Sequence, residues 1–263
     1  MFLSIRKQIR APRLPEGRRV YAVGDIHGEA GLFAALLARI EADMRQRTPM
    51  RTTLILLGDV VDRGARAIEL LRGLHATIGP DLVLLKGNHE AALIDVYRGD
   101  EEAMGFWIRF GGRATLAELG ITVPASGRVD PAQVLWQLRD ALDPALIDWL
   151  DALPHSVTIG DYVFCHAGIR PGVPLRRQDP DDLLWIREPF LSSRAQHGKV
   201  VVHGHTTEPG GPVFRRNRIG VDTGAHEHGV LSAVGLEGGE QWAVQVERMP
   251  AVGVPTMGLA LAG

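Results

Sequence analysis

The sequence contains almost no cysteine, little net charge and no long apolar run. A single cysteine, Cys165, among 263 residues excludes an internal disulfide or a thiolate zinc cluster and is typical of a reducing, cytoplasmic environment. The formal net charge of −2 argues against binding to nucleic acid through bulk positive charge. No apolar run approaches the roughly 20 residues of a membrane-spanning helix, which argues against a membrane partner. The oligomeric state stays open.

Glycine, by contrast, is abundant. It accounts for 31 of the 263 residues, against a usual proportion of about 7%, which predicts many tight turns. Hydrophobic residues (45%) and charged residues (23%) are in the proportions of a globular chain. We expect one domain over residues 20–248, a basic arm at 1–19 and a flexible, small-residue tail at 249–263. The arm is expected either to be loosely attached or to contact an acidic partner.

Five short apolar runs predict buried strands, because each is bounded by glycine or ends abruptly in polar residues. The runs cover residues 20–24, 53–58, 82–85, 162–165 and 200–202. Between the first three runs, apolar residues recur every three or four positions at 29–47 and 65–78, which predicts helices. Strands that alternate with helices predict an α/β fold in which helices pack on a sheet.

The pattern changes from about residue 96 to residue 153. Helical stretches at 101–110 and 131–153 replace the strand-like runs there, and we interpret this region as a helical insertion beside the sheet. Strand-like sequence then returns. Residues 229–236 and 242–246 predict a final antiparallel pair of strands.

Side chains that can bind metals follow all five apolar runs. Their oxygen and nitrogen donors suit Mn²⁺, Fe²⁺ or Zn²⁺, and six ligands are too many for one tetrahedral zinc. Two metals that share a carboxylate would use all six and could clamp a phosphoryl group. Asp59, which ends the middle of the first three strands, is the natural bridge. The six candidate ligands are Asp25, His27, Asp59, Asn88, His166 and His205.

Taken singly, these residues have ordinary explanations. Asp25 and Asp59 follow glycines and precede helical patterns, so either could cap a helix. His166 or His205 alone could be a turn or core histidine. Side chains that can bind a metal occur at all five strand ends, and this pattern favours a metal site over these separate explanations.

A second group of residues indicates a phosphate substrate. Arg63 and Arg187 are candidates because an arginine fork binds phosphate oxygens through two parallel hydrogen bonds. The alternatives are a surface ion pair for Arg63 and a solvated helical position for Arg187. His89 could protonate the leaving oxygen, with Asp62 to orient it.

Three motifs occur in a recognisable order. GDIHG at 24–28, GDVVDRG at 58–64 and GNHE at 87–90 resemble the signature of the phosphoprotein phosphatase family, in its bacterial and phage form, within the calcineurin-like metallophosphoesterase superfamily. The later segments FCHAG at 164–168, GHT at 204–206, VDTGA at 221–225 and Trp185–Arg187 resemble the second half of its small members. The resemblance extends from about Val20 to Leu236.

This resemblance implies a calcineurin-like fold, in which two packed mixed β-sheets are flanked by helices. It implies two divalent ions, taken as Mn²⁺ with Fe²⁺ or Zn²⁺ as alternatives, and direct attack by a metal-bridging hydroxide without a phosphoenzyme. It also implies that His89 is the general acid, with Asp62 as its partner. The implied ligands are Asp25, His27 and Asp59 for one metal and Asp59, Asn88, His166 and His205 for the other, and the implied phosphate-binding residues are Arg63, Asn88 and Arg187.

Three further histidines lie near these motifs. The GHT pattern selects His205 as the ligand, and His203 is then expected to be a neighbouring hydrogen-bonding residue. His226 and His228 either border the substrate pocket or are simply exposed.

The motifs indicate the reaction rather than the substrate, which depends on the surrounding surface and the helical insertion. The complete GDVVDRG motif and the Arg187 segment favour a serine/threonine protein phosphatase acting on phosphorylated proteins. The alternative is a hydrolase that splits small dinucleoside polyphosphates, such as diadenosine tetraphosphate, symmetrically. A non-catalytic binding scaffold is a remote third hypothesis. A scaffold would be expected to lack a metal ligand or the general acid, whereas this sequence has a suitable residue at each of those positions.

Overall fold

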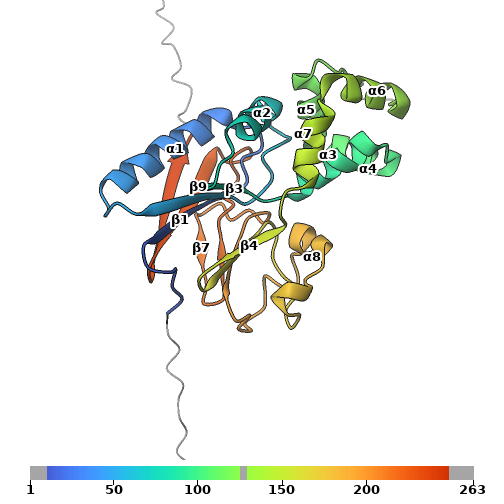
Figure 1. Ribbon diagram of the computed structural model, residues 1–263. Helices are drawn as coiled ribbons and strands as arrows, with labels where there is room; N and C mark the ends of the chain where they lie inside the picture. Colours follow the sequence, from blue (N-terminus) through green and yellow to red (C-terminus); the bar gives the residue numbers. More distant parts are fainter. Residues whose placement is uncertain (1–10, 125–128, 249–263) are drawn as a thin grey trace, which may run out of the picture.

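Two five-stranded sheets form the centre of the protein, and helices flank them (Figure 1). The computed structural model describes residues 11–124 and 129–248. Both sheets are mixed, because each contains parallel and antiparallel neighbours. The predicted α/β fold of two mixed sheets flanked by helices is therefore confirmed.

The first sheet joins the three predicted parallel strands to the predicted antiparallel pair, in the order β10–β9–β1–β2–β3. Helices α1 (Ala30–Arg45) and α2 (Ala67–Thr77) connect the parallel strands and cover one face of the sheet (Figure 1). Because β2 lies between β1 and β3, the loop after β2 faces the loops after both neighbours. The strands are β1 (Arg18–Val23), β2 (Arg51–Leu56), β3 (Leu82–Leu84), β9 (Val230–Glu237) and β10 (Glu240–Glu247).

The second sheet has the order β4–β5–β6–β8–β7. Sequence patterns predicted only β5 and β6, because these two consist of continuous apolar runs that are buried along their length. β4 alternates exposed and half-buried residues, and β7 and β8 are too short to show a period. The bounds are β4 (Ser156–Ile159), β5 (Tyr162–Cys165), β6 (Val200–His203), β7 (Val213–Phe214) and β8 (Arg218–Gly220).

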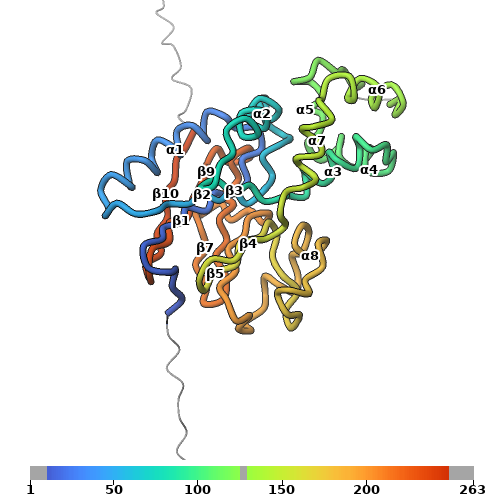
Figure 2. Tube along the Cα trace, viewed as in Figure 1, coloured from blue at the N-terminus to red at the C-terminus, as the bar shows by residue number. Residues whose placement is uncertain are grey.

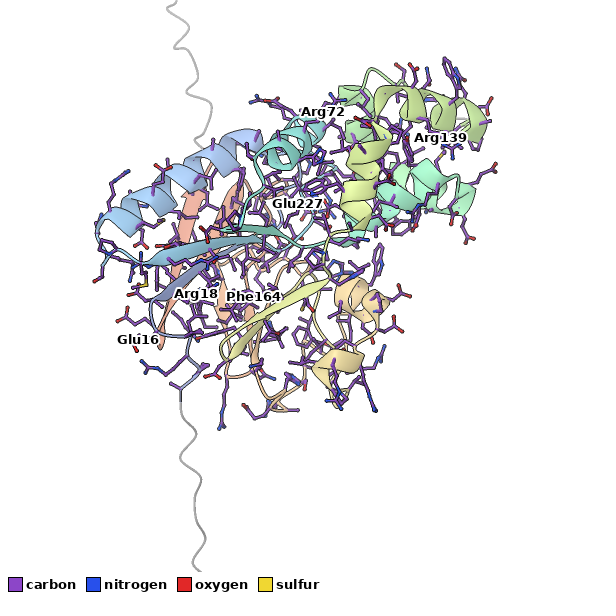
Figure 3. All side chains as sticks on the ribbon, viewed as in Figure 1. Glu16, Arg18, Arg72, Arg139, Phe164 and Glu227 are labelled. Carbon is purple, nitrogen blue, oxygen red and sulfur yellow. The ribbon has the colours of Figure 1, made fainter. Side chains whose placement is uncertain are left out.

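The alternation of side chains along β1 explains how the layers pack. Val20 and Ala22 point into the core between the two sheets, where they join Phe164 of β5 (Figure 3). Tyr21 and Val23 point the other way, into the core beneath the helices. Because both faces of the strand are covered, its residues from 19 to 23 are all buried, and burial of each larger apolar side chain stabilises the fold by about 1.5–3 kcal/mol.

The helical segment, residues 88–124 and 129–151, lies to one side of the sheets (Figure 2). It contains helix α3, which begins at Asn88, together with the region that the sequence predicts to be an insertion at 96–153. The helix predicted at 131–153 is broken into two, because Asp143 caps a new helix that starts at Pro144. The segment contains α3 (Asn88–Arg98), α4 (Glu101–Trp107), the π-helical turn η1 (Ile108–Gly112), α5 (Arg113–Glu118), α6 (Pro131–Ala141) and α7 (Pro144–Asp151).

The remaining elements are a short 3-10 turn, η2 (Leu175–Arg177), and helix α8 (Pro180–Trp185), which packs beside the second sheet. The sheet begins at Arg18, slightly before the domain boundary predicted at residue 20, and Leu14 is already buried. Residues 1–10 of the predicted arm and the predicted tail at 249–263 lie outside the described residues. Within the described residues, no helix combines the length and the apolar character needed to cross a membrane.

The burial of Cys165 generates a test of this core. Its thiol is fully buried at the end of β5, and burial raises its pKa to about 12. Because the thiolate is the reactive form, we expect the native protein at pH 8 to resist an aromatic disulfide reagent and to release one equivalent of chromophore only in guanidinium chloride. Rapid stoichiometric labelling of the native protein would contradict this packing.

Candidate functional site

A cavity of about 620 Å³ opens where the strands of the two sheets end. Eight of the ten predicted site residues line it, and the other two, Asp62 and His166, are fully buried next to them. The expected gathering of the strand ends is therefore observed. The eight are Asp25, His27, Asp59, Arg63, Asn88, His89, Arg187 and His205.

The loops around this cavity adopt an unusual backbone conformation. Within residues 11–124 and 129–248, five residues other than glycine have a positive φ, and all five are predicted site residues. Such a conformation costs about 1–3 kcal/mol for a residue with a side chain and is characteristic of functional sites. The residues and angles are His27 (48°), Asp59 (52°), Asp62 (71°), Arg63 (64°) and His205 (61°).

Two glycines of the motifs allow carboxylates to approach the backbone closely. A Cβ atom on Gly87 would overlap with Oδ1 of Asp59, and one on Gly204 would overlap with Oδ1 of Asp25. Both glycines immediately precede a candidate ligand, Asn88 and His205. Any larger residue at either position would therefore push a carboxylate out of the site.

The buried carboxylate of Glu90 joins the loop after β2 to the start of α3. It accepts hydrogen bonds from the backbone N–H groups of Asp59 (2.8 Å), Val60 (2.8 Å), Val61 (3.1 Å) and Gly87 (2.9 Å). Burial and then the neighbouring Asp59 raise the pKa of Glu90 to about 7, although the N–H groups favour its ionised form. The sequence patterns did not indicate a role for Glu90. Its place three residues after Gly87, as in a capping box, was the available signal.

Two histidines are oriented by backbone carbonyls. Nδ1 of His27 lies 3.0 Å from the carbonyl oxygen of Val61, and Nδ1 of His166 lies 2.9 Å from that of Leu57. Donation from Nδ1 leaves Nε2 with a free lone pair in both rings. These Nε2 atoms lie 3.7 Å and 3.5 Å from Oδ2 of Asp59. Both rings therefore present a metal-ligating atom to the same carboxylate.

The contacts of Asn88 indicate how a cation fits the site. Its Oδ1 atom lies 2.7 Å from Nε2 of His166 and 2.9 Å from Nδ1 of His205. Because His166 donates from Nδ1, its Nε2 lone pair faces the Asn88 oxygen, and two acceptors at this distance repel each other. A divalent cation coordinated by both atoms removes this repulsion, and the oxygen and nitrogen donors suit Mn²⁺, Fe²⁺ or Zn²⁺.

The charge balance of the cavity also fits a cation. Burial, then Asp222 and Asp59, raise the pKa of the Asp25 carboxyl well above its usual value. Burial lowers the pKa values of His27 and His205 to about 3. Neutral imidazoles beside crowded carboxylates are the state that binds a metal.

Among residues 11–124 and 129–248, two groups of side chains could hold an ion, and Asp59 belongs to both. His27, Asp59 and His89 form one group and Asp59, His166 and His205 the other, and within each group the ligand atoms lie within 4.8 Å of one another. A shared central carboxylate agrees with the predicted bridging position of Asp59. The backbone N–H of His205 donates to both carboxylate oxygens of Asp25, each at 3.1 Å, and so places this carboxylate beside the second group.

His89 is held by the fully buried carboxylate of Asp62. Nδ1 of His89 donates to Oδ2 of Asp62 at 2.7 Å, as the predicted pairing requires. Burial disfavours the imidazolium, but the Asp59 and Asp62 carboxylates outweigh burial and raise the pKa of His89. Two residues of the helical segment complete the arrangement, because Trp107 Nε1 (2.8 Å) and Thr115 Oγ1 (2.6 Å) also donate to Asp62. Sequence patterns gave no signal for Trp107 or Thr115.

The two candidate phosphate-binding arginines border the cavity. Nη1 of Arg63 lies 3.2 Å from Oε1 of Glu227, which also lines the cavity. Figure 3 shows Glu227 near the centre of the view, where the strand ends face the helical segment. Arg187 lies just after α8, outside the helical position considered as its alternative. Asp222, which sequence reasoning did not select, also lines the cavity and accepts a hydrogen bond from Thr207 at 2.7 Å.

The three uncertain histidines have different surroundings. His203 is fully buried, and its ring lies 3.0 Å from the Gly204 carbonyl and 3.2 Å from the Arg218 guanidinium, as expected of a hydrogen-bonding neighbour. His226 lies 3.1 Å from Glu29 and borders an adjoining hollow rather than the main cavity. His228 is exposed.

The chain is similar in sequence to known phosphoesterases. A family model described as calcineurin-like phosphoesterase matches residues 18–230. The symmetrical bis(5'-nucleosyl)-tetraphosphatase of Dechloromonas aromatica is 32% identical over 152 residues, which are 57% of this chain and 44% of that protein. The protein of the same name from Yersinia pestis is 31% identical over 155 residues, 57% of this chain and 42% of that protein. The match spans less than half the length of these curated relatives.

Three solved structures share the fold. A crystal structure described as that of a candidate diadenosine tetraphosphatase has a TM-score of 0.61 and 22% identity and covers 90% of this chain and 98% of that chain. A protein serine/threonine phosphatase from Saccharomyces cerevisiae has a TM-score of 0.52 and 14% identity, and the match covers 89% of this chain and 81% of that chain. A cold-active protein tyrosine phosphatase has a TM-score of 0.53 and 16% identity, and the match covers 88% of this chain and 81% of that chain. At these identities the likeness shows the fold alone.

The contacts of Glu90 predict a loss of stability in Glu90→Gln. A glutamine has one acceptor oxygen, and its NH₂ group would face N–H donors, so we expect the free energy of unfolding to fall by about 1–3 kcal/mol. Urea unfolding of the metal-free protein measures this effect apart from any change in metal affinity. The matched control is Glu41→Gln on the exposed face of α1, where we expect a change within about 0.5 kcal/mol. Equal stabilities of the two variants would refute the role of Glu90.

Proposed function

The chain belongs to the calcineurin-like phosphoesterase family, and we propose that this metal-binding phosphoester hydrolase splits dinucleoside tetraphosphates symmetrically. The observation that carries the substrate assignment is the identity of 31–32% to proteins named as symmetrical bis(5'-nucleosyl)-tetraphosphatases. The serine/threonine protein phosphatase, which the sequence motifs favoured, becomes the second candidate. Its support is the complete GDVVDRG motif and the Arg187 segment, because the likeness to a serine/threonine phosphatase at 14% identity shows the fold alone.

The GDVVDRG motif has a role in the proposed reaction whichever phosphate ester is the substrate. Asp62 of this motif holds His89 at 2.7 Å, and Arg63 borders the cavity. Both roles would serve the hydrolysis of a dinucleotide as well as that of a phosphoprotein. The motif therefore supports the reaction, and the choice of substrate depends on the residues that surround it.

Each site residue has a role in the proposed reaction. Two divalent ions, which we take to be Mn²⁺, would polarise the phosphoryl oxygens and lower the pKa of the attacking water. Arg63, Asn88 and Arg187 bind the phosphate oxygens and orient the scissile bond. His89, held at Nδ1 by Asp62, delivers a proton from Nε2 to the leaving oxygen. The residues that would hold the ions are Asp25, His27 and Asp59 for one and Asp59, Asn88, His166 and His205 for the other.

The separate roles of His89 and Asp59 predict different losses on mutation. We expect His89→Asn to lower kcat about 10²- to 10⁴-fold, because it removes the proton donor, while the metal content stays near that of the wild type. We expect Asp59→Asn to lower kcat and the content of both metals together. Steady-state kinetics and elemental analysis of the purified variants measure these effects. A loss of both metals in His89→Asn would show that His89 is a ligand instead.

The substrate assignment is tested by a direct comparison on manganese-loaded protein. The measurement is kcat/KM for diadenosine tetraphosphate and for a phosphothreonine peptide. We expect a clear preference for the dinucleotide, with two molecules of adenosine diphosphate as the products of symmetrical cleavage. A preference for the peptide would make the chain a protein phosphatase, and unequal nucleotide products would contradict symmetrical cleavage.

A further inference from the structure

Exposed large apolar side chains cluster beside the candidate metal centre. The described residues include six such side chains, and three of them, Phe106, Phe110 and Trp185, line the main cavity. Each is 40–47% exposed. Scattered exposed apolar residues are ordinary, but a cluster at the edge of a cavity marks a binding surface. We call these three residues the aromatic wall.

The rings of the aromatic wall touch one another and reach the metal ligands. The ring centroids of Phe106 and Phe110 are 4.2 Å apart with planes inclined by 31°, and those of Phe106 and Trp185 are 5.9 Å apart. At these separations no further ring fits between neighbours, so a flat ligand would have to stack on an outer face of the wall. Trp185 also lies 6.2 Å from the ring of His205. The aromatic wall is therefore continuous with the metal centre.

Two segments far apart in the sequence build the aromatic wall. Phe106 lies in α4 and Phe110 four residues later in the π-helical turn, so both side chains leave the same side of the helix. Trp185 is the last residue of α8, close to Arg187. Fold stability does not explain this placement, because exposed rings gain only part of the benefit of burial.

We propose that the aromatic wall is a nucleobase subsite, on which one adenine of a dinucleoside polyphosphate stacks while the phosphate chain lies across the metal centre. This inference rests on the proposed function and adds the residues that recognise the base. Arg63 and Arg187 border the same cavity and supply positive charge for phosphates. Flat aromatic surface and arginine charge side by side match the two chemical halves of a nucleotide.

Binding to the manganese-loaded full chain tests the subsite. The variants are Phe106→Leu, Phe110→Leu and their combination, because leucine keeps an apolar side chain but lacks a flat ring. The ligands are adenosine diphosphate, which carries a base, and pyrophosphate, which does not. The control is Trp136→Leu, since Trp136 is 68% exposed on α6 and does not line the cavity.

Calorimetry gives, for each protein, the dissociation constants of adenosine diphosphate and of pyrophosphate, and the ratio of the two measures the selectivity for the base. We expect the double variant to lose on the order of tenfold in selectivity for adenosine diphosphate over pyrophosphate, the size of one base–aromatic stack. Trp136→Leu should keep the ratio of the wild type. The KM for diadenosine tetraphosphate should rise in parallel in the double variant.

The outcomes separate this inference from the proposed function. If the wild type hydrolyses diadenosine tetraphosphate but the double variant keeps the full selectivity, the subsite is refuted and the function stands. If the wild type prefers the phosphothreonine peptide and the double variant weakens peptide binding, the proposed function is wrong and the aromatic wall is a peptide-binding surface, which also overturns the subsite.

Discussion

The arrangement of the site depends on the four hydrogen bonds that the Glu90 carboxylate accepts. Three come from backbone N–H groups after β2 and one from Gly87 before α3. Because this region is buried, these N–H groups would lose their partners without Glu90. The same contacts set the position of Asp59 relative to α3, which begins at Asn88. The shared carboxylate, an amide ligand and the proposed proton donor therefore depend on a single buried anion.

The left-handed backbone conformations of the site loops lower the stability of the fold, and burial of apolar side chains in the core offsets this loss. Five site residues have a left-handed backbone, at about 1–3 kcal/mol each. Burial of one apolar side chain returns about 1.5–3 kcal/mol, and the strands that precede these loops are buried on both faces. The two packed sheets can therefore hold strained loops that the local sequence would not adopt in isolation.

The helical segment links the reaction chemistry to the choice of substrate. Trp107 and Thr115 donate to Asp62 and so help to orient His89. Phe106 and Phe110, from the same part of the chain, form the aromatic wall at the edge of the cavity. A change in this segment would therefore affect both proton delivery and substrate binding, whereas the candidate metal ligands come mainly from the strand ends.

The sequence by itself determined the fold class, the strands that end at the site and the ligand-type side chains, because apolar runs and short motifs are local features. It did not predict β4, β7 and β8, whose alternation or length gives no apolar run. Only the tertiary structure decided that Glu90 joins two loops, that Trp107 and Thr115 hold Asp62, and that Phe106 and Trp185 meet at one cavity. These arrangements are contacts between residues far apart in the chain, and they follow from how the two sheets and the helical segment pack.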